Sequence, residues 1–176
     1  MERVAGADTT ATAARATLLA IISNPRVHAQ FVKEIDTAES RGVISSPIRD
    51  QEARGLQYVQ ACIKEGLRLF PPLGQLRERM VPPEGDTYKG KHIPGGTFIG
   101  LNTRGIELSP VFGEDAQVFR PERWLTHDEA RLSEMSRIQD HVFGHGTTRC
   151  LGAPIASMIL NKIFVEVSQT SEVSWP

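Results

Sequence analysis

One short segment near the end of the chain, FGHGTTRCLG (143–152), limits the possible folds more than any other part of the sequence. Gly144, Gly146 and Gly152 surround Cys150, and a basic residue directly precedes the cysteine. Glycine permits positive φ and lets the backbone come close to a bulky group. Positive charge and free amide N–H groups favour the thiolate, which is the form of cysteine that binds metals. The segment therefore predicts a loop wrapped around a functional sulfur.

The composition is that of one soluble domain and excludes several classes of protein. The chain has 176 residues, 40% of them hydrophobic and 23% charged, so it is long enough to bury a core. Its net charge is −1, with basic residues spread along the sequence, and we expect no nucleic-acid partner. Two cysteines do not make a disulfide framework. No signal pattern opens the chain and no apolar run is long enough to cross a bilayer, so we expect a soluble chain without a membrane segment.

Helical periodicity dominates the first part of the chain. Helices are expected over 11–23, 25–39 and 56–70, and the pair Pro71-Pro72 ends the third. Asn24 is a good N-cap for the second helix, which starts with a proline. Apolar residues three or four positions apart predict the buried faces of the second and third helices, which are Val27, Phe31 and Ile35, and Leu56, Val59, Ile63 and Leu67.

The pattern changes after these prolines. From 73 to 119, turn signals alternate with short β-type runs such as TFIGLN (97–102), which predicts small hairpins and irregular chain. The polar segment 126–140 fits either a helix or a mobile segment, and 153–167 is again helical. The sequence thus predicts a mostly α fold with a small β part.

Four separated motifs are interpreted together, because both their residues and their order along the chain are informative. They are AGADTT (5–10), the E-x-x-R pair of Glu65 and Arg68, the PER segment with Arg123, and the cysteine loop. Together they resemble the cytochrome P-450 family, the haem-thiolate monooxygenases. The phrase YVQACIKEGLRLFPP is similar to filamentous-fungal members of the kind used in secondary metabolism. The resemblance covers nearly all of the chain and implies a single partial haem-thiolate domain over 1–176, the C-terminal half of the family fold.

The resemblance implies roles for the residues of the cysteine loop. Cys150 is expected to be the proximal thiolate ligand of the haem iron, where a thiolate pushes electron density onto the metal. Phe143 is expected beside the thiolate, while Gly144 and Gly146 let the loop curl under the haem. His141 and His145 near the cysteine are only loosely spaced like zinc ligands and lack an obvious fourth partner, so zinc is disfavoured.

One position in this loop departs from the family pattern. The family usually has a basic residue two positions before the cysteine, where it pairs with a haem propionate, and here that position is Thr148. Arg149 is basic, but it lies one position closer to the cysteine than the family pattern requires. Arg79, in RERMVPP, matches another propionate-pairing position, so the resemblance assigns that role to Arg79. Cys62 lies in the third predicted helix and is expected to be structural.

The AGADTT motif resembles the oxygen-handling site of the family. The small residues Ala5 and Gly6 would leave room for dioxygen over the iron. Thr9 offers a hydroxyl that can pass a proton, and Asp8 can supply the proton relay. Taken alone, such a motif is more often an N-cap or a turn.

The resemblance also assigns a structural role to the E-x-x-R pair. A helix places Glu65 and Arg68 on one face, although such pairs are common on helix surfaces. In the family this pair meets the PER arginine, here Arg123, in a buried cluster. Removing one member of a buried charged cluster typically costs about 3–5 kcal/mol.

The family resemblance implies a haem-dependent monooxygenase. Its cofactors are haem (iron protoporphyrin) and dioxygen, and its electrons come from NADPH through a reductase partner. Its substrate is a small, lipophilic organic molecule, and its full-length members are anchored in the endoplasmic-reticulum membrane. The sequence begins four residues before AGADTT, so we expect a truncated chain that lacks much of the substrate pocket and does not turn over substrate alone. The alternative is a non-catalytic remnant or interaction fragment.

Overall fold

The computed structural model describes residues 2–74 and 77–170. The architecture is mostly α with a small β part, as the sequence predicts. The α-helices are α1 (Glu2–Ile22), α2 (Pro25–Ser40), α3 (Asp50–Arg54), α4 (Gln57–Leu69), α5 (Thr103–Glu107), α6 (Glu129–Gln139) and α7 (Ala153–Thr170). The strands are β1 (Arg77–Met80), β2 (Asp86–Tyr88), β3 (Lys91–Ile93) and β4 (Phe98–Leu101). Short 3-10 helices are η1 (Pro110–Phe112), η2 (Pro121–Leu125), η3 (Asp140–Phe143) and η4 (Gly146–Thr148).

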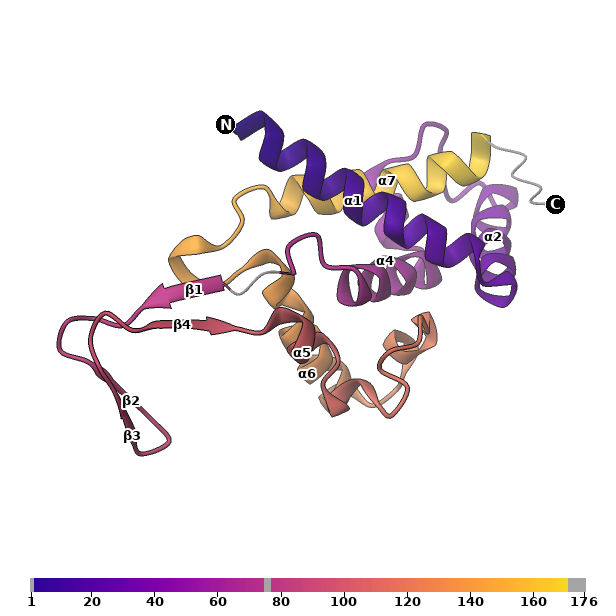
Figure 1. Cartoon of the computed structure of the whole chain (residues 1–176). Coiled ribbons are helices and arrows are strands. Elements are labelled where there is room, and N and C mark those ends of the chain that lie inside the picture. The colour runs from indigo at the N-terminus through magenta and orange to yellow at the C-terminus, as the bar shows by residue number, and fades with distance from the viewer. Residues whose placement is uncertain (1, 75–76, 171–176) are drawn as a thin grey trace.

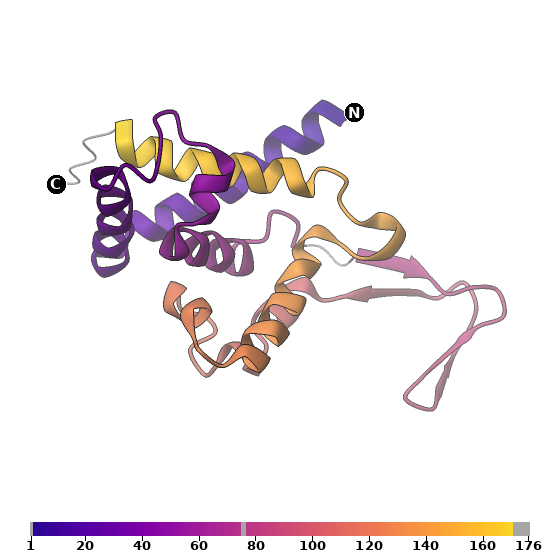
Figure 2. The same cartoon turned by 180° about the vertical axis from the view of Figure 1, so that it is seen from behind.

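A helical layer forms the main body of the molecule. The helices α1 and α7 come from opposite ends of the chain and lie across each other above α4, with α2 at one side (Figure 1). The view from behind shows the same arrangement, with α7 leading back to the cysteine loop (Figure 2). One buried cluster joins these helices, and its members include Ile21, Val27, Phe31, Ile35, Val59, Ile63, Leu160 and Phe164. Among the described helices, none has the length and apolar character needed to cross a bilayer.

The predicted second helix has the expected cap and face. Asn24 adopts an extended backbone, and its side-chain oxygen accepts a hydrogen bond from the N–H of Val27 at 3.3 Å. This bond satisfies one of the amide groups that the first turn leaves without a helical partner. Val27, Phe31 and Ile35 are all buried, so the periodicity identified the correct face.

The third predicted helix, α4, is the most deeply buried element. Leu56, Val59, Ile63 and Leu67 are all buried as the spacing predicts. The N-terminus of α4 is capped from another helix, because the Glu34 carboxylate of α2 accepts hydrogen bonds from the N–H groups of Tyr58 at 3.0 Å and Val59 at 2.9 Å. Negative charge at a helix N-terminus is favourable, and the contact fixes α2 against α4.

The helix that contains AGADTT is longer than predicted. Periodicity gave a start at Ala11, whereas α1 already includes Glu2. Inside this added part of the helix, the Thr9 hydroxyl donates to the Ala5 carbonyl at 2.7 Å one turn earlier. This is the back-bond that threonine makes inside helices, so Thr9 is an interior residue of α1 and not an N-cap.

The β part forms an arm that projects from the helices (Figure 1). Strands β1 and β4 pair antiparallel, with Arg79 opposite Ile99, and β2 and β3 form a second antiparallel pair further out. The β4 strand confirms the extended run predicted in TFIGLN. Its residues are exposed, so the arm adds little to the core.

The chain between the arm and the cysteine loop builds a second, smaller core. Phe112, Trp124 and Met135 are buried in it, and the rings of Phe112 and Trp124 lie 5.9 Å apart. The segment 126–140, for which the sequence allowed either a helix or a mobile segment, contains α6 with Asp128 as its N-cap. Met135 is the fully buried residue of α6, and Leu132 and Ile138 pack against the same core while partly buried.

Candidate functional site

A cavity of about 480 Å³ lies between α1, α4, β1, the cysteine loop and α7. Thr9 and Ala5 line it from α1, Arg79 from β1, and Phe143, Thr148 and Cys150 from the loop. The other lining residues are apolar or carry a hydroxyl. Arg79 is the one residue with a charged side chain among the described residues that line the cavity. The site is thus an apolar chamber with a sulfur and a single cation in its wall.

The cysteine loop needs glycine at two of its positions. Gly144 has φ of 80° and Gly146 has φ of 63°, a backbone conformation that other residues adopt only with strain. The N–H of Cys150 donates to the Phe143 carbonyl at 2.7 Å and closes the loop. The Cys150 side chain is exposed, in contrast to a cysteine that fills a core. The loop therefore presents its sulfur to the cavity.

The motif AGADTT is only partly directed at this cavity. Ala5, Thr9 and Ala13 line it, as expected for residues four apart on one helical face. Gly6 and Asp8 belong to the described part of the chain, but they do not line the cavity, and both are exposed. A Cβ atom on Gly6 would meet nothing within 4 Å, so the protein structure itself does not require glycine there. The structure brings Thr9 to the cavity and leaves Gly6 and Asp8 on other faces of α1.

The two arginines near the cysteine point to different places. Arg149 donates to the Asp140 carboxylate through both terminal nitrogens, at 2.7 and 3.0 Å. Its partner raises the pKa of the Arg149 guanidinium through a hydrogen bond and through charge attraction. Arg79 instead donates to the hydroxyl of Thr148 at the cavity edge. Arg79 thus approaches the position at which the family pattern usually has a cation.

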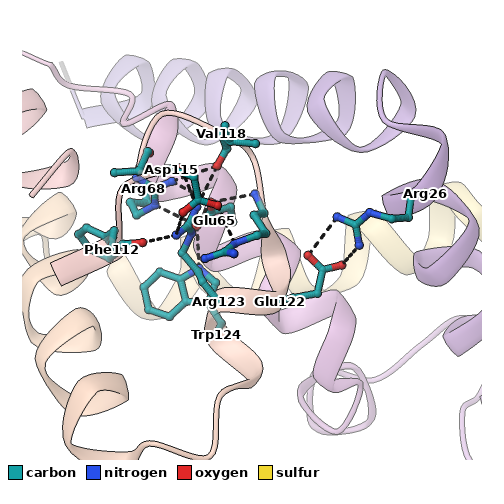
Figure 3. Close-up of polar contacts among 11 residues, drawn as sticks. Arg26, Glu65, Arg68, Phe112, Asp115, Val118, Glu122, Arg123 and Trp124 are labelled. Atoms are coloured by element: carbon teal, nitrogen blue, oxygen red, sulfur yellow. Dashed lines mark hydrogen bonds and ion pairs between the residues drawn. The ribbon is translucent and has the colours of Figure 1, made fainter. Parts of the chain in front are cut away.

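The structure brings Glu65, Arg68 and Arg123 into one buried network (Figure 3). Both carboxylate oxygens of Glu65 bind Arg68, at 2.9 and 2.7 Å, and one of them also binds Nε of Arg123 at 2.8 Å. The same carboxylate accepts the indole N–H of Trp124 at 2.9 Å and the backbone N–H of Arg120 at 3.0 Å. A buried charge with this many donors is well satisfied.

The two arginines use their other donors to hold irregular backbone. Arg68 donates to the carbonyl groups of Glu107 and Ala116, both at 2.7 Å. Arg123 donates to the carbonyl of Val118 at 3.1 Å and also to that of Phe112. These carbonyl groups lie in or beside segments without long helices or strands. The network therefore fixes the fold of residues 107–124 against α4.

A second polar cluster lies beside this network and was not predicted. Glu122 of the PER segment binds Arg26 of α2 (Figure 3). Glu122 also accepts the Tyr58 hydroxyl at 2.7 Å. Burial and then the bond to Glu122 raise the pKa of Tyr58. Burial acts to raise the pKa of Glu122, but the bonds from Arg26 and Tyr58 prevail and lower it. The cluster connects η2 to α2 and α4.

The other titratable candidates take no part in the cavity. Cys62 is fully buried in α4, and burial raises the pKa of its thiol. The rings of His141 and His145 stack with centroids 5.6 Å apart. Within the described part of the chain, no group of three or more His, Cys, Asp or Glu residues is arranged to hold a metal ion.

Several residues of the cavity wall were not predicted from the sequence. They are apolar positions, including Ala13, Leu67, Pro72, Leu73, Val142 and Leu160. For Ala13 a signal existed, because it follows Thr9 by four positions on the same helix. For the others, only the packing of separate elements shows which side chains face the cavity.

Comparison with known proteins gives consistent matches over almost the whole chain. The family model described as cytochrome P-450 matches residues 3–175. The chain is 46% identical over 169 residues to cytochrome P-450 monooxygenase ABA1 of Pyricularia oryzae, which covers 95% of this chain and 33% of the relative. It is 41% identical over 165 residues to cytochrome P-450 monooxygenase aba1 of Botryotinia fuckeliana, covering 93% and 32%. It is 36% identical over 170 residues to cytochrome P-450 monooxygenase cicH of Emericella nidulans, covering 96% and 34%. The chain therefore spans about a third of the length of these relatives.

Proposed function

Because the chain belongs to the cytochrome P-450 family, we propose that it forms the thiolate side of the haem site in a monooxygenase. The observation that carries this proposal is the cavity, because Thr9 and Cys150 both line it although they lie 141 positions apart in the sequence. The proposed substrate is a small, lipophilic organic molecule, since the described walls of the cavity are mostly apolar. Electrons reach the site singly, from NADPH through a reductase.

The residues of the cavity fit the chemistry of haem. Haem is a flat, largely apolar ring that carries two carboxylates and an iron ion that accepts a sulfur ligand. Cys150 offers a sulfur ligand, the apolar wall suits the ring, and Arg79 offers the cation for a carboxylate. The turns at Gly144 and Gly146, which glycine makes without strain, keep side chains away from the backbone next to the sulfur. Cys150, Phe143 and Arg79 are the residues that would hold the group.

Haem held there would supply the activation of dioxygen, of which one atom would enter the substrate and the other would become water. Thr9 holds a proton at Oγ1, which it now donates to the Ala5 carbonyl, and can redirect it into the cavity. Asp8 lies next to it on the exposed side of α1, where it can exchange protons with water. The network of Glu65, Arg68 and Arg123 keeps the surrounding backbone in place and takes no part in the chemistry.

The axial ligand can be tested by spectroscopy, without any assay of turnover. The chain is expressed with a haem supply, reduced and exposed to carbon monoxide. We expect a thiolate-type absorption spectrum for the wild type and for Cys62→Ser, whose altered thiol is buried away from the cavity. Cys150→Ser is expected to lose this spectrum. Identical spectra for Cys150→Ser and the wild type would contradict the proposal.

A further inference from the structure

Two residues from distant segments meet at the edge of the cavity. Arg79 lies in β1 and Thr148 in η4, and both line the cavity. Nη2 of Arg79 donates to the Thr148 hydroxyl and, at 3.4 Å, to the carbonyl of His145, while Nη1 donates to the Glu78 carbonyl at 3.1 Å. The Thr148 hydroxyl in turn donates to the His145 carbonyl at 3.3 Å. A hydroxyl has one proton to donate and lone pairs to accept with, so these bonds form a consistent chain.

This contact decides where the single cation of the cavity lies. Arg79 is the only charged residue among the described residues that line the cavity. The neighbouring Arg149 is not one of these residues, and its guanidinium is paired with Asp140. Arg79 is otherwise an exposed side chain on the projecting arm, with many rotamers open to it. The bond to Thr148 selects the rotamers that bring its guanidinium to the cysteine loop. A guanidinium has five N–H donors, and the bonds given above leave some of them for a ligand.

We propose that Thr148 is a positioning residue, whose hydroxyl holds the Arg79 guanidinium at the cavity edge where it binds a carboxylate of the haem. This inference rests on the proposed haem site. Thr148 occupies the position at which the family pattern has a cation, and here it keeps a cation from another segment at that place. Fixing a flexible side chain before the ligand arrives removes part of the ordering cost of binding. Thr148 therefore contributes to haem affinity without itself carrying charge.

The test measures how fast haem leaves the chain for an excess of a haem-scavenging protein. Thr148→Val removes the hydroxyl at nearly constant shape and is expected to raise the dissociation rate about three- to tenfold, as for loss of one ordinary hydrogen bond. Thr148→Ser keeps the hydroxyl and is expected to behave as the wild type. Thr147→Val is the matched control, because Thr147 is an exposed residue of the same turn. Arg79→Gln is expected to raise the rate at least as much as Thr148→Val.

Two further comparisons separate positioning from a general effect on the loop. In the Arg79→Gln background, Thr148→Val is expected to add little, because the two residues act as a unit. With haem dimethyl ester, whose carboxylates are blocked, Thr148→Val is expected to have no effect. A full additional effect in either comparison would overturn the inference, as would a wild-type chain that holds haem no better than Arg79→Gln. The spectrum of Cys150→Ser tests the proposed function separately, since Thr148 and Arg79 do not ligate the iron.

Discussion

Gly66 of α4 faces Thr17 of α1 so closely that no side chain fits between them. A Cβ atom on Gly66 would lie 1.9 Å from Oγ1 and 2.5 Å from Cγ2 of Thr17, far inside contact distance. Thr17 is itself buried, with 2% of its surface exposed. Gly66 stands between Glu65 and Leu67, so this contact joins the helix of the buried charge network to the helix that carries Thr9.

Gly66→Ala is therefore expected to destabilise the fold. Overpacking a core by one methyl group typically costs about 1–3 kcal/mol, and here the clash involves Thr17, a buried β-branched residue. Gly6→Ala is the matched control, because Gly6 is a helical glycine with nothing within 4 Å of a built Cβ atom. Alanine is favoured over glycine inside helices, so Gly6→Ala should keep or raise the melting temperature. Thermal unfolding that ranks Gly66→Ala equal to Gly6→Ala would rule out the close contact.

Glu65 and Arg123 are expected to act as one unit in unfolding experiments. Each alanine variant removes one member of the buried charged network, which costs about 3–5 kcal/mol. The double variant is expected to cost clearly less than the sum, since the second substitution removes the charge that the first left behind. Arg54→Ala breaks an exposed ion pair with Asp50 and is the control, with an expected cost of about 1 kcal/mol or less. Denaturant unfolding measures all four, and additivity would contradict a shared network.

The two cysteines are expected to differ strongly in reactivity. Cys150 is exposed, whereas Cys62 is fully buried with a raised thiol pKa, so a thiol reagent should modify only Cys150 in the folded chain. Cys150→Ser is expected to abolish the fast reaction and Cys62→Ser to leave it unchanged. Added haem should slow the fast reaction, because the proposed ligand is the same sulfur. Fast reaction persisting in Cys150→Ser would show that the cysteine in α4 is accessible.

Glu52 is expected to contribute to the loss of folding stability at low pH. The N–H and hydroxyl of Ser45 and the N–H of Arg49 donate to its carboxylate and lower its pKa from 4.5 to about 2. The folded chain therefore gains stability from the ionised carboxylate above pH 4.5, and loses this contribution as the pH falls toward about 2. Glu52→Gln is expected to weaken the dependence of melting temperature on pH in this window. Glu134→Gln, at an exposed position of α6, should preserve the wild-type dependence.

Local chemistry in the sequence was enough to determine several elements of the fold. The cap at Asn24 and the buried faces of α2 and α4 were predicted because caps and periodicity depend on residues a few positions apart. The glycines around Cys150 likewise predicted a loop with positive φ, and Gly144 and Gly146 do adopt positive φ. The order of the motifs was sufficient to identify the family, which the family model and the relatives show.

Only the tertiary structure decided which distant groups meet. The cap on α4 comes from Glu34 of another helix, and the space at Gly66 is set by Thr17. Arg79 meets Thr148 across 69 positions of sequence, while Arg149 turns to Asp140 instead. The periodicity of the sequence does not predict such contacts, because they depend on how whole helices and strands pack against each other. The sequence by itself thus determined the local elements and the family, whereas the packing of those elements determined which polar side chains face the cavity.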